Sequence, residues 1–108
     1  MRDFIFIDDV VEAYLVSSKL KNTHGEVFNI GSGIQYETVK IASTIVNLIA
    51  KDVRINWEND LNRQYEPAIW VSDNKRIYGK LNWKPNVDIN TGLNNTINWF
   101  INNLHLYK

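Results

Sequence analysis

The feature that most constrains the fold of this chain is an alternation between short apolar runs and longer stretches whose apolar residues recur every three or four positions. A short run of β-favouring residues is typical of a strand, and a recurrent stripe is typical of a helix that buries one side. Because a helix stripe and a strand face both need cover, such a sequence packs helices against a sheet. The sequence predicts an α/β fold with strands at residues 4–7, 27–30 and 53–57.

Side-chain oxygens ahead of the helical stripes predict where the helices begin. Asp8 and Asp9 stand before the first stripe, and Glu12 follows Asp9 at the spacing of a capping box. We interpret these acids as caps rather than as paired catalytic carboxylates or metal ligands, because no histidine accompanies them. Further helices are expected to have caps at Thr38, Asp73 and Asp88.

The stripes also predict which sides of the helices are buried. The stripe of the first helix comprises Val11, Tyr14, Leu15 and Ser18. The stripe of the last helix comprises Leu93, Ile97, Phe100, Ile101 and Leu104. Trp83 and Trp99 are expected to pack in the core or against another domain. No repeat or linker divides the chain, so residues 1–108 are expected to form a single domain.

Charge and composition argue against several classes of function. Twelve basic residues balance twelve acidic ones, so no long-range field would attract nucleic acid or an anionic membrane. The chain has no cysteine, and its two histidines, His24 and His105, lack acidic neighbours at ligand spacing, so we expect no metal site. No signal-peptide pattern opens the sequence and no apolar run is long enough to span a bilayer, which favours the cytoplasm.

Four segments carry a resemblance to a known family. They read RDFIFIDDVVEA at residues 2–13, VFNIGSG at 27–33, LNWKP at 81–85, and GL followed by TINWF at 92–93 and 96–100. In this order and spacing they resemble consecutive signatures of the extended short-chain dehydrogenases/reductases, the family of the NAD-dependent nucleotide-sugar epimerases and dehydratases. The resemblance covers the carboxy-terminal third of that family.

The resemblance implies that catalysis depends on a part of the family fold that is absent here. In the family, an amino-terminal Rossmann half holds NAD or NADP through a glycine-rich loop and carries a Tyr-x-x-x-Lys pair. Gly31 and Gly33 lack the third glycine and the downstream acid of such a loop. Tyr36 and Lys40 match the catalytic spacing, but they follow the second signature instead of preceding the first. We therefore expect this chain alone to bind no cofactor and to be inactive.

The resemblance also names candidate substrate-binding residues. Arg2 occupies the position of an arginine that contacts the substrate diphosphate, and arginine suits phosphate because its donors form a fixed fork. Arg63 and Glu66 resemble a second element, in which the arginine contacts the diphosphate and the acid accepts from the ribose hydroxyls. The alternatives are a solvated arginine at position 2 and an exposed ion pair in the loop. Trp57 and Trp70 flank that loop, and one of them is a candidate for the pocket wall.

The expected function is therefore to bind a nucleotide-diphosphate sugar against a Rossmann half. The intact family oxidises a sugar carbon by hydride transfer to the cofactor, and this part would orient the substrate. Two alternatives remain open: a stand-alone nucleotide-binding or interaction module, and a remnant that folds but binds nothing. The first two strands should leave a sheet edge exposed, so a homo-oligomer is also expected.

Overall fold

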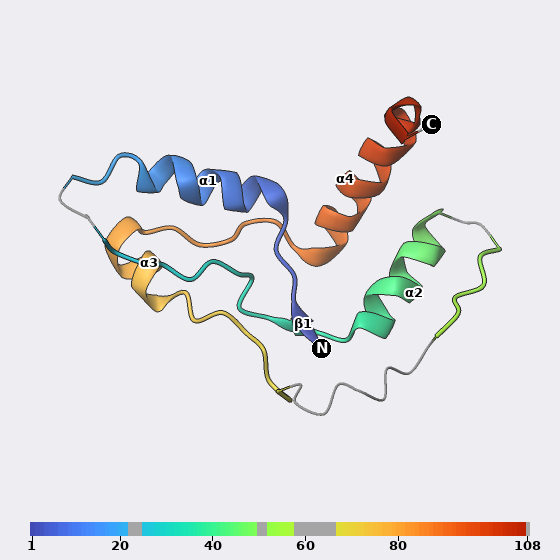
Figure 1. The fold of residues 1–108 in the computed structure, drawn as a ribbon, viewed down its shortest axis with the longest axis horizontal. Coiled ribbons are helices and arrows are strands. Elements are labelled where there is room, and N and C mark those ends of the chain that lie inside the picture. The colour runs from blue at the N-terminus through green and yellow to red at the C-terminus, as the bar shows by residue number, and fades with distance from the viewer. Residues whose placement is uncertain (22–24, 50–51, 58–66, 108) are drawn as a thin grey trace.

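The fold is an open arrangement of helices around a very small sheet (Figure 1), and the computed structural model describes residues 1–21, 25–49, 52–57 and 67–107. The elements in chain order are β1 (Arg2–Asp3), α1 (Ile7–Ser17), β2 (Gln35–Tyr36), α2 (Thr38–Ile49), α3 (Lys75–Leu81), α4 (Ile89–Asn102) and the 3-10 helix η1 (Leu104–Tyr107). β1 and β2 pair antiparallel, with Arg2 opposite Tyr36 and Asp3 opposite Gln35. The order of strands and helices confirms the expected α/β class, although the strands are short.

The apolar runs at residues 4–7, 27–30 and 53–57 do not form the predicted strands. The strand lies just before the first run, at Arg2–Asp3, and Ile7 already begins α1. Residues 27–30 and 53–57 are extended or irregular chain without a ladder. A run becomes a strand only when a second backbone lies beside it, and among the described residues β1 and β2 pair only with each other.

The predicted capping box at the start of α1 is wrong. The residue before the helix is Phe6, which makes no side-chain cap. Asp9 lies inside the first turn, is 97% buried (3% exposed), and accepts hydrogen bonds from the backbone N–H groups of Asn86 at 3.0 Å and Val87 at 3.1 Å. Glu12 accepts a long bond of 3.4 Å from the Asn86 side chain. These acids therefore tie α1 to the segment that leads into α4.

The predicted cap of the last helix is confirmed. Asp88 Oδ1 accepts from the backbone N–H groups of Asn90 at 2.9 Å and Thr91 at 3.1 Å, and its other oxygen accepts from the Thr91 hydroxyl at 2.5 Å. The hydroxyl bond is the largest cause that lowers the pKa of Asp88, and the backbone bonds add to it.

The starts of α2 and α3 differ slightly from expectation. Thr38 is the first residue of α2 rather than its cap. Asp73 accepts from the backbone N–H of Lys75 at 3.0 Å, one residue ahead of the position at which a cap stands. α3 then continues through Gly79 to Leu81 and ends at Asn82, whose φ of 50° is left-handed.

The core lies between α1, α3 and the segment that precedes α4. Its buried apolar residues are Ala13, Ile77 and Trp83, so Trp83 packs in the core as predicted. The partly buried apolar residues around them are Ile5, Val16, Phe28, Ile30 and Leu81. Trp99 instead lies on the surface, in edge-to-face contact with Phe100 and Tyr107 near the end of the chain.

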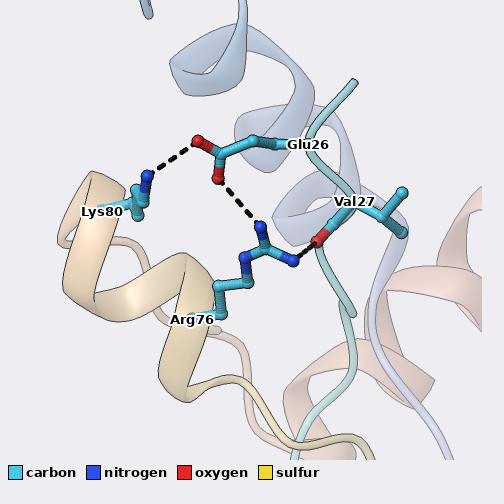
Figure 2. Close-up of polar contacts among 4 residues, drawn as sticks. All are labelled: Glu26, Val27, Arg76 and Lys80. Carbon is cyan, nitrogen blue, oxygen red and sulfur yellow. Dashed lines mark hydrogen bonds and ion pairs between the residues drawn. The ribbon is translucent and has the colours of Figure 1, made fainter. Parts of the chain in front are cut away.

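An ion-pair network fastens the chain after residue 25 to α3 (Figure 2). Glu26 accepts from Lys80 Nζ at 2.7 Å and from Arg76 Nη2 at 3.3 Å, while Arg76 Nη1 donates to the carbonyl of Val27 at 3.1 Å. The hydrogen bond from Lys80 is the main cause that lowers the pKa of Glu26. These contacts hold residues 26 and 27 against α3, on the side of the molecule away from β1 (Figure 1).

The molecule is less compact than is usual for a chain of this length. The predicted apolar stripes of the first and last helices are therefore not fully buried. Its radius of gyration is 17.1 Å, whereas a compact chain of this length has about 13 Å. Its accessible surface is 8855 Å², against about 6,200 Å² for a compact monomer of this mass. On α1, the stripe residues Val11, Tyr14 and Leu15 are 48%, 70% and 60% exposed. In the stripe predicted for the last helix, Leu93 and Ile97 of α4 are half-buried. Phe100 and Ile101 near the end of α4 are exposed, and so is Leu104 in η1.

Within the described part of the chain, no helix has the length and apolar character that crossing a bilayer requires.

Candidate nucleotide-binding site

A cavity of about 480 Å³ lies beside β1, between two segments that are distant in sequence. Its walls come from the start of the chain, from the segment before Ser32, and from the segment before α3. The lining residues are Arg2, Asp3, Phe28, Asn29, Ile30, Gly31, Trp70, Val71 and Ser72. The cavity thus combines a cation, an aromatic ring and several backbone groups in one concave surface.

The carboxylate of Asp3 joins the walls of this cavity. Its Oδ1 accepts from the backbone N–H of Ser32 at 2.7 Å and from the Ser32 hydroxyl at 2.5 Å. Its Oδ2 accepts from the backbone N–H of Gly33 at 3.1 Å and from that of Ser72 at 2.9 Å. One side chain therefore connects β1 with the 31–33 turn and with the segment that precedes α3.

The glycines of the turn are required by this close packing. A Cβ atom added to Gly31 would lie 2.6 Å from Asp3 Oδ2 and 2.5 Å from the Cβ of Ser72, which is closer than atoms can pack. Gly33 has a φ of +75°, a left-handed conformation that other residues seldom adopt. The Gly-Ser-Gly sequence is therefore the one that lets two segments meet at the carboxylate.

Hydrogen bonding keeps Asp3 ionised. Desolvation is the largest single influence and would raise the pKa of Asp3, but the bonds from the Ser32 hydroxyl and from the backbone of Ser72, Ser32 and Gly33 together outweigh it. The pKa of Asp3 consequently lies below its ordinary value. At neutral pH the carboxylate is an acceptor only, which suits the four donors around it.

Arg2 and Trp70 both line the cavity and contact each other. The guanidinium carbon lies 5.0 Å from the centroid of the indole ring, and Nη1 donates to the carbonyl of Met1 at 2.7 Å. Gln35 fixes the Trp70 backbone, since its side-chain oxygen accepts from the Trp70 N–H at 3.2 Å and its nitrogen donates to the Ala68 carbonyl at 2.8 Å. The aromatic partner of Arg2 is thus held by β2.

No protein-family model matches the sequence. A curated relative, the dTDP-D-glucose 4,6-dehydratase of Homo sapiens, is 32% identical over 112 aligned residues, which cover 99% of this chain and 31% of the dehydratase. Among solved structures, UDP-glucose 4-epimerase from Thermotoga maritima with UDP-glucose is 26% identical with a TM-score of 0.80, over 94% of this chain and 32% of that one.

The chain is a carboxy-terminal part of an extended short-chain dehydrogenase/reductase.

A further structural relative agrees with this family. The Bordetella bronchiseptica enzyme WbmF, solved in complex with NAD+ and UDP, has a TM-score of 0.78 and 26% identity, and the match covers 97% of this chain and 30% of WbmF. The present chain spans about 31% of the length of the curated relative described above. The resemblance inferred from the four sequence signatures is therefore confirmed, together with the α/β class.

The predicted binding residues of this short-chain dehydrogenase/reductase are only partly visible. Arg2 lies on the wall of the cavity, as described above. Arg63 and Glu66 lie outside the described residues. Trp57 and Trp70 were the two candidates for the pocket wall. Trp70 lines the cavity, whereas Trp57 is not among its lining residues.

Two motifs in the sequence resemble catalytic or cofactor-binding motifs but were not predicted to act as such: the pair Tyr36 and Lys40, and Gly-x-Gly at residues 31–33. The structure describes both. Tyr36 lies in β2 opposite Arg2, while Lys40 is exposed on the first turn of α2. The N–H groups of Ser32 and Gly33, which a dinucleotide loop would offer to a pyrophosphate, donate to Asp3. In this structure these N–H groups of the Gly-x-Gly sequence are therefore already paired within the chain. No group of three or more His, Cys, Asp or Glu side chains in the described segments suits a metal ion.

Sequence reasoning missed Asp3, Gln35 and Ser72 as parts of the site. Asp3 stood next to Arg2, but its partners are 29, 30 and 69 residues away. The only local signal was the Gly-Ser-Gly turn, whose glycines indicated an unusual backbone without indicating what approaches it.

Proposed function

We propose that this chain binds the nucleotide diphosphate of a nucleotide sugar, as the substrate-binding part of an NAD- or NADP-dependent epimerase or dehydratase. The observation that carries the proposal is Arg2 on the wall of a cavity within the size range of small-molecule sites. The named activities of the relatives support it, because the human relative is a dTDP-D-glucose dehydratase and the Thermotoga maritima relative was solved with UDP-glucose.

The chemistry of a diphosphate matches the groups around the cavity. Two adjacent phosphates need concentrated positive charge, and a guanidinium supplies it with donors that reach two oxygens at once. The cation–π contact with Trp70 restricts the Arg2 guanidinium, which reduces the conformational entropy that binding would otherwise cost. Arg63 and Glu66, as proposed contacts to the diphosphate and the ribose, would complete the site.

The open shape supports a role as one part of a larger fold. The exposed stripe of α1, formed by Val11, Tyr14 and Leu15, is apolar surface of the kind that a second folded unit covers. We propose that a Rossmann half, which in the intact enzyme would hold NAD or NADP and transfer the hydride, covers it. The part seen here then orients the sugar nucleotide and takes no part in the hydride step.

A stand-alone nucleotide-binding module is the second candidate. It is favoured by one observation, namely that the described residues of this chain form a cavity of about 480 Å³ with Arg2 on its wall. The two candidates differ in whether nucleotide binding requires a Rossmann half.

Isothermal titration calorimetry with UDP and dTDP tests both. The chain would be titrated alone and after mixing with the portion of the human dehydratase that it does not match. Arg2→Ala should weaken binding by about tenfold or more, because a charge-assisted contact is lost. The control is Arg54→Ala, which removes an exposed arginine outside the cavity. Binding by the chain alone supports the module, binding only in the mixture supports the enzyme part, and no binding in either state refutes both.

A further inference from the structure

We propose that Asp3 is the positioning residue of this site: its carboxylate holds the walls of the cavity at the spacing at which Arg2 can meet a diphosphate. The inference rests on the proposed function, because the ligand that Arg2 would meet is the nucleotide diphosphate. Asp3 itself would not contact that anion, since like charges repel.

The Asp3 carboxylate is saturated by its donors. An ionised carboxylate offers about four lone-pair sites, and four donors occupy them here: the N–H and hydroxyl of Ser32, and the N–H groups of Gly33 and Ser72. Only an ionised aspartate satisfies all four, because asparagine has a single acceptor oxygen and would turn N–H donors toward N–H donors. The arrangement therefore requires the charge of the side chain as well as its shape.

The donors belong to the two segments that, together with β1, line the cavity or continue its lining. Ser32 and Gly33 follow the wall at residues 28–31, while Ser72 closes the wall at residues 70–72. The walls approach so closely at this point that the carboxylate and the Cβ of Ser72 fill the place of a Gly31 side chain. Asp3 thus determines how far apart the two walls stand.

Asp3 is also coupled to both members of the Arg2–Trp70 pair. It follows Arg2 directly in β1, so the backbone that Asp3 anchors is the backbone that presents Arg2. Ser72 is two residues beyond Trp70, and an extended chain of that length spans only about 7 Å. Release of Ser72 from Asp3 would therefore move the indole ring relative to the guanidinium that it stacks on.

The test is the affinity of Asp3→Asn for UDP, measured by calorimetry in whichever state of the wild-type chain binds UDP. We expect a loss of about tenfold or more, because hydrogen bonds to a charged acceptor are removed and donors are left unpaired. The matched control is Asp52→Asn, an exposed aspartate outside the cavity, which should leave the affinity unchanged. Far-UV circular dichroism would confirm that the helices are retained.

A spectroscopic signature distinguishes positioning from general stability. In Asp3→Asn, the Nε–H resonance of Arg2 and the indole resonance of Trp70 should both shift, because the ring no longer lies over the guanidinium. The indole resonance of Trp83 in the core should stay where it is. Equal shifts of Trp70 and Trp83 would indicate a global effect and would overturn the positioning role.

Ser32→Ala is a milder variant in case Asp3→Asn does not fold. It removes the hydroxyl bond to Asp3 and the bond that the same hydroxyl accepts from the Ile34 N–H at 3.1 Å, and it leaves the backbone bond to Asp3 in place. We expect a loss of about threefold to tenfold in affinity. Its control is Ser43→Ala, which removes a hydroxyl that donates to Val39 within α2. Unchanged affinity in Ser32→Ala, with wild-type binding intact, would overturn the inference about Asp3 alone. Absence of UDP binding by the wild type would overturn the proposed function itself.

Discussion

The guanidinium of Arg2 and the indole ring of Trp70 face each other at 5.0 Å, although the two residues are far apart in the chain. Arg2 is held by β1, and Trp70 is held by the side chain of Gln35 in the paired strand β2. The two-stranded sheet, small as it is, therefore brings a cation and an aromatic ring to the wall of the same cavity. The relationship leads to the first prediction.

Replacement of Trp70 by leucine should weaken UDP binding about twofold to fivefold. A cation–π contact at an exposed site contributes about 0.5 to 1 kcal/mol, and the loss of stacking frees Arg2 to adopt other rotamers. Calorimetric titration with UDP measures the effect. Trp57→Leu is the matched control, because Trp57 is 52% exposed and Trp70 is 53% exposed. Equal losses in the two variants would show that stacking on Arg2 is not the cause.

Replacement of Asp9 by alanine should lower the free energy of unfolding by about 1 to 3 kcal/mol. The backbone N–H groups of Asn86 and Val87 would lose their acceptor, the buried carboxylate of Asp9. Urea denaturation followed by circular dichroism measures the change. Asp8→Ala, on the exposed side of the same helical turn, should cost far less. A comparable cost at Asp8 would mean that helix electrostatics, rather than the link to residues 86–87, explains the effect.

The two helical glycines should respond differently to alanine. Gly79 lies in α3 with nothing among the described residues within 4 Å of an added Cβ, so Gly79→Ala should stabilise the chain by about 0.5 to 1 kcal/mol through reduced backbone entropy. In α4, an added Cβ at Gly92 would lie 3.2 Å from Cδ2 of Phe6, so steric strain should offset the gain. Thermal unfolding of both variants tests this prediction, and an equal rise in Tm would contradict it.

The chain should lose stability in acid because three carboxyl groups have lowered pKa values. The pKa values of Asp3 and Asp88 lie below the ordinary 3.8, and that of Glu26 lies below 4.5. Below the ordinary values the unfolded chain takes up protons that the folded chain still refuses. The stability they contribute is therefore complete above about pH 4.5 and is lost as the pH falls through the folded values. Urea midpoints between pH 6 and pH 3 measure the loss.

Asp88→Asn isolates one of these contributions. Asparagine caps a helix about as well as aspartate does, so stability at pH 6 should change little. Because it does not ionise, the urea midpoint of the variant should fall less steeply in acid than that of the wild type. An unchanged slope would mean that ionisation of Asp88 does not contribute to the acid sensitivity.

The helices were more predictable than the strands. α4 begins where Asp88 predicted, because a helix cap is a contact within a few residues. Asp9 carried a similar local signal, yet its carboxylate binds backbone groups 77 and 78 residues away. A local pattern identifies a side chain that needs donors, but the choice between near and distant donors depends on which segments the fold brings together.

In the candidate site, too, some residues were predicted from the sequence and others were not. Arg2 was predicted from the family signature that it opens, and it lies in the cavity. Asp3 and Ser72 were not predicted, because a single aspartate and a single serine carry no pattern that indicates contact across 69 residues. Gln35 was missed for the same reason, since its hydrogen bonds go to backbone groups, which every residue possesses.

The sequence by itself determined the family, the α/β class and the cap of α4, because these depend on local chemistry and on signatures in a fixed order. Only the tertiary structure decided that the apolar stripe of α1 stays exposed and that Asp3 gathers two distant segments around Arg2. The physical reason is that burial and hydrogen bonding across the chain depend on which surfaces meet. An apolar stripe predicts that one face of a helix needs to be buried. Which segment buries that face depends on the packing of the folded chain.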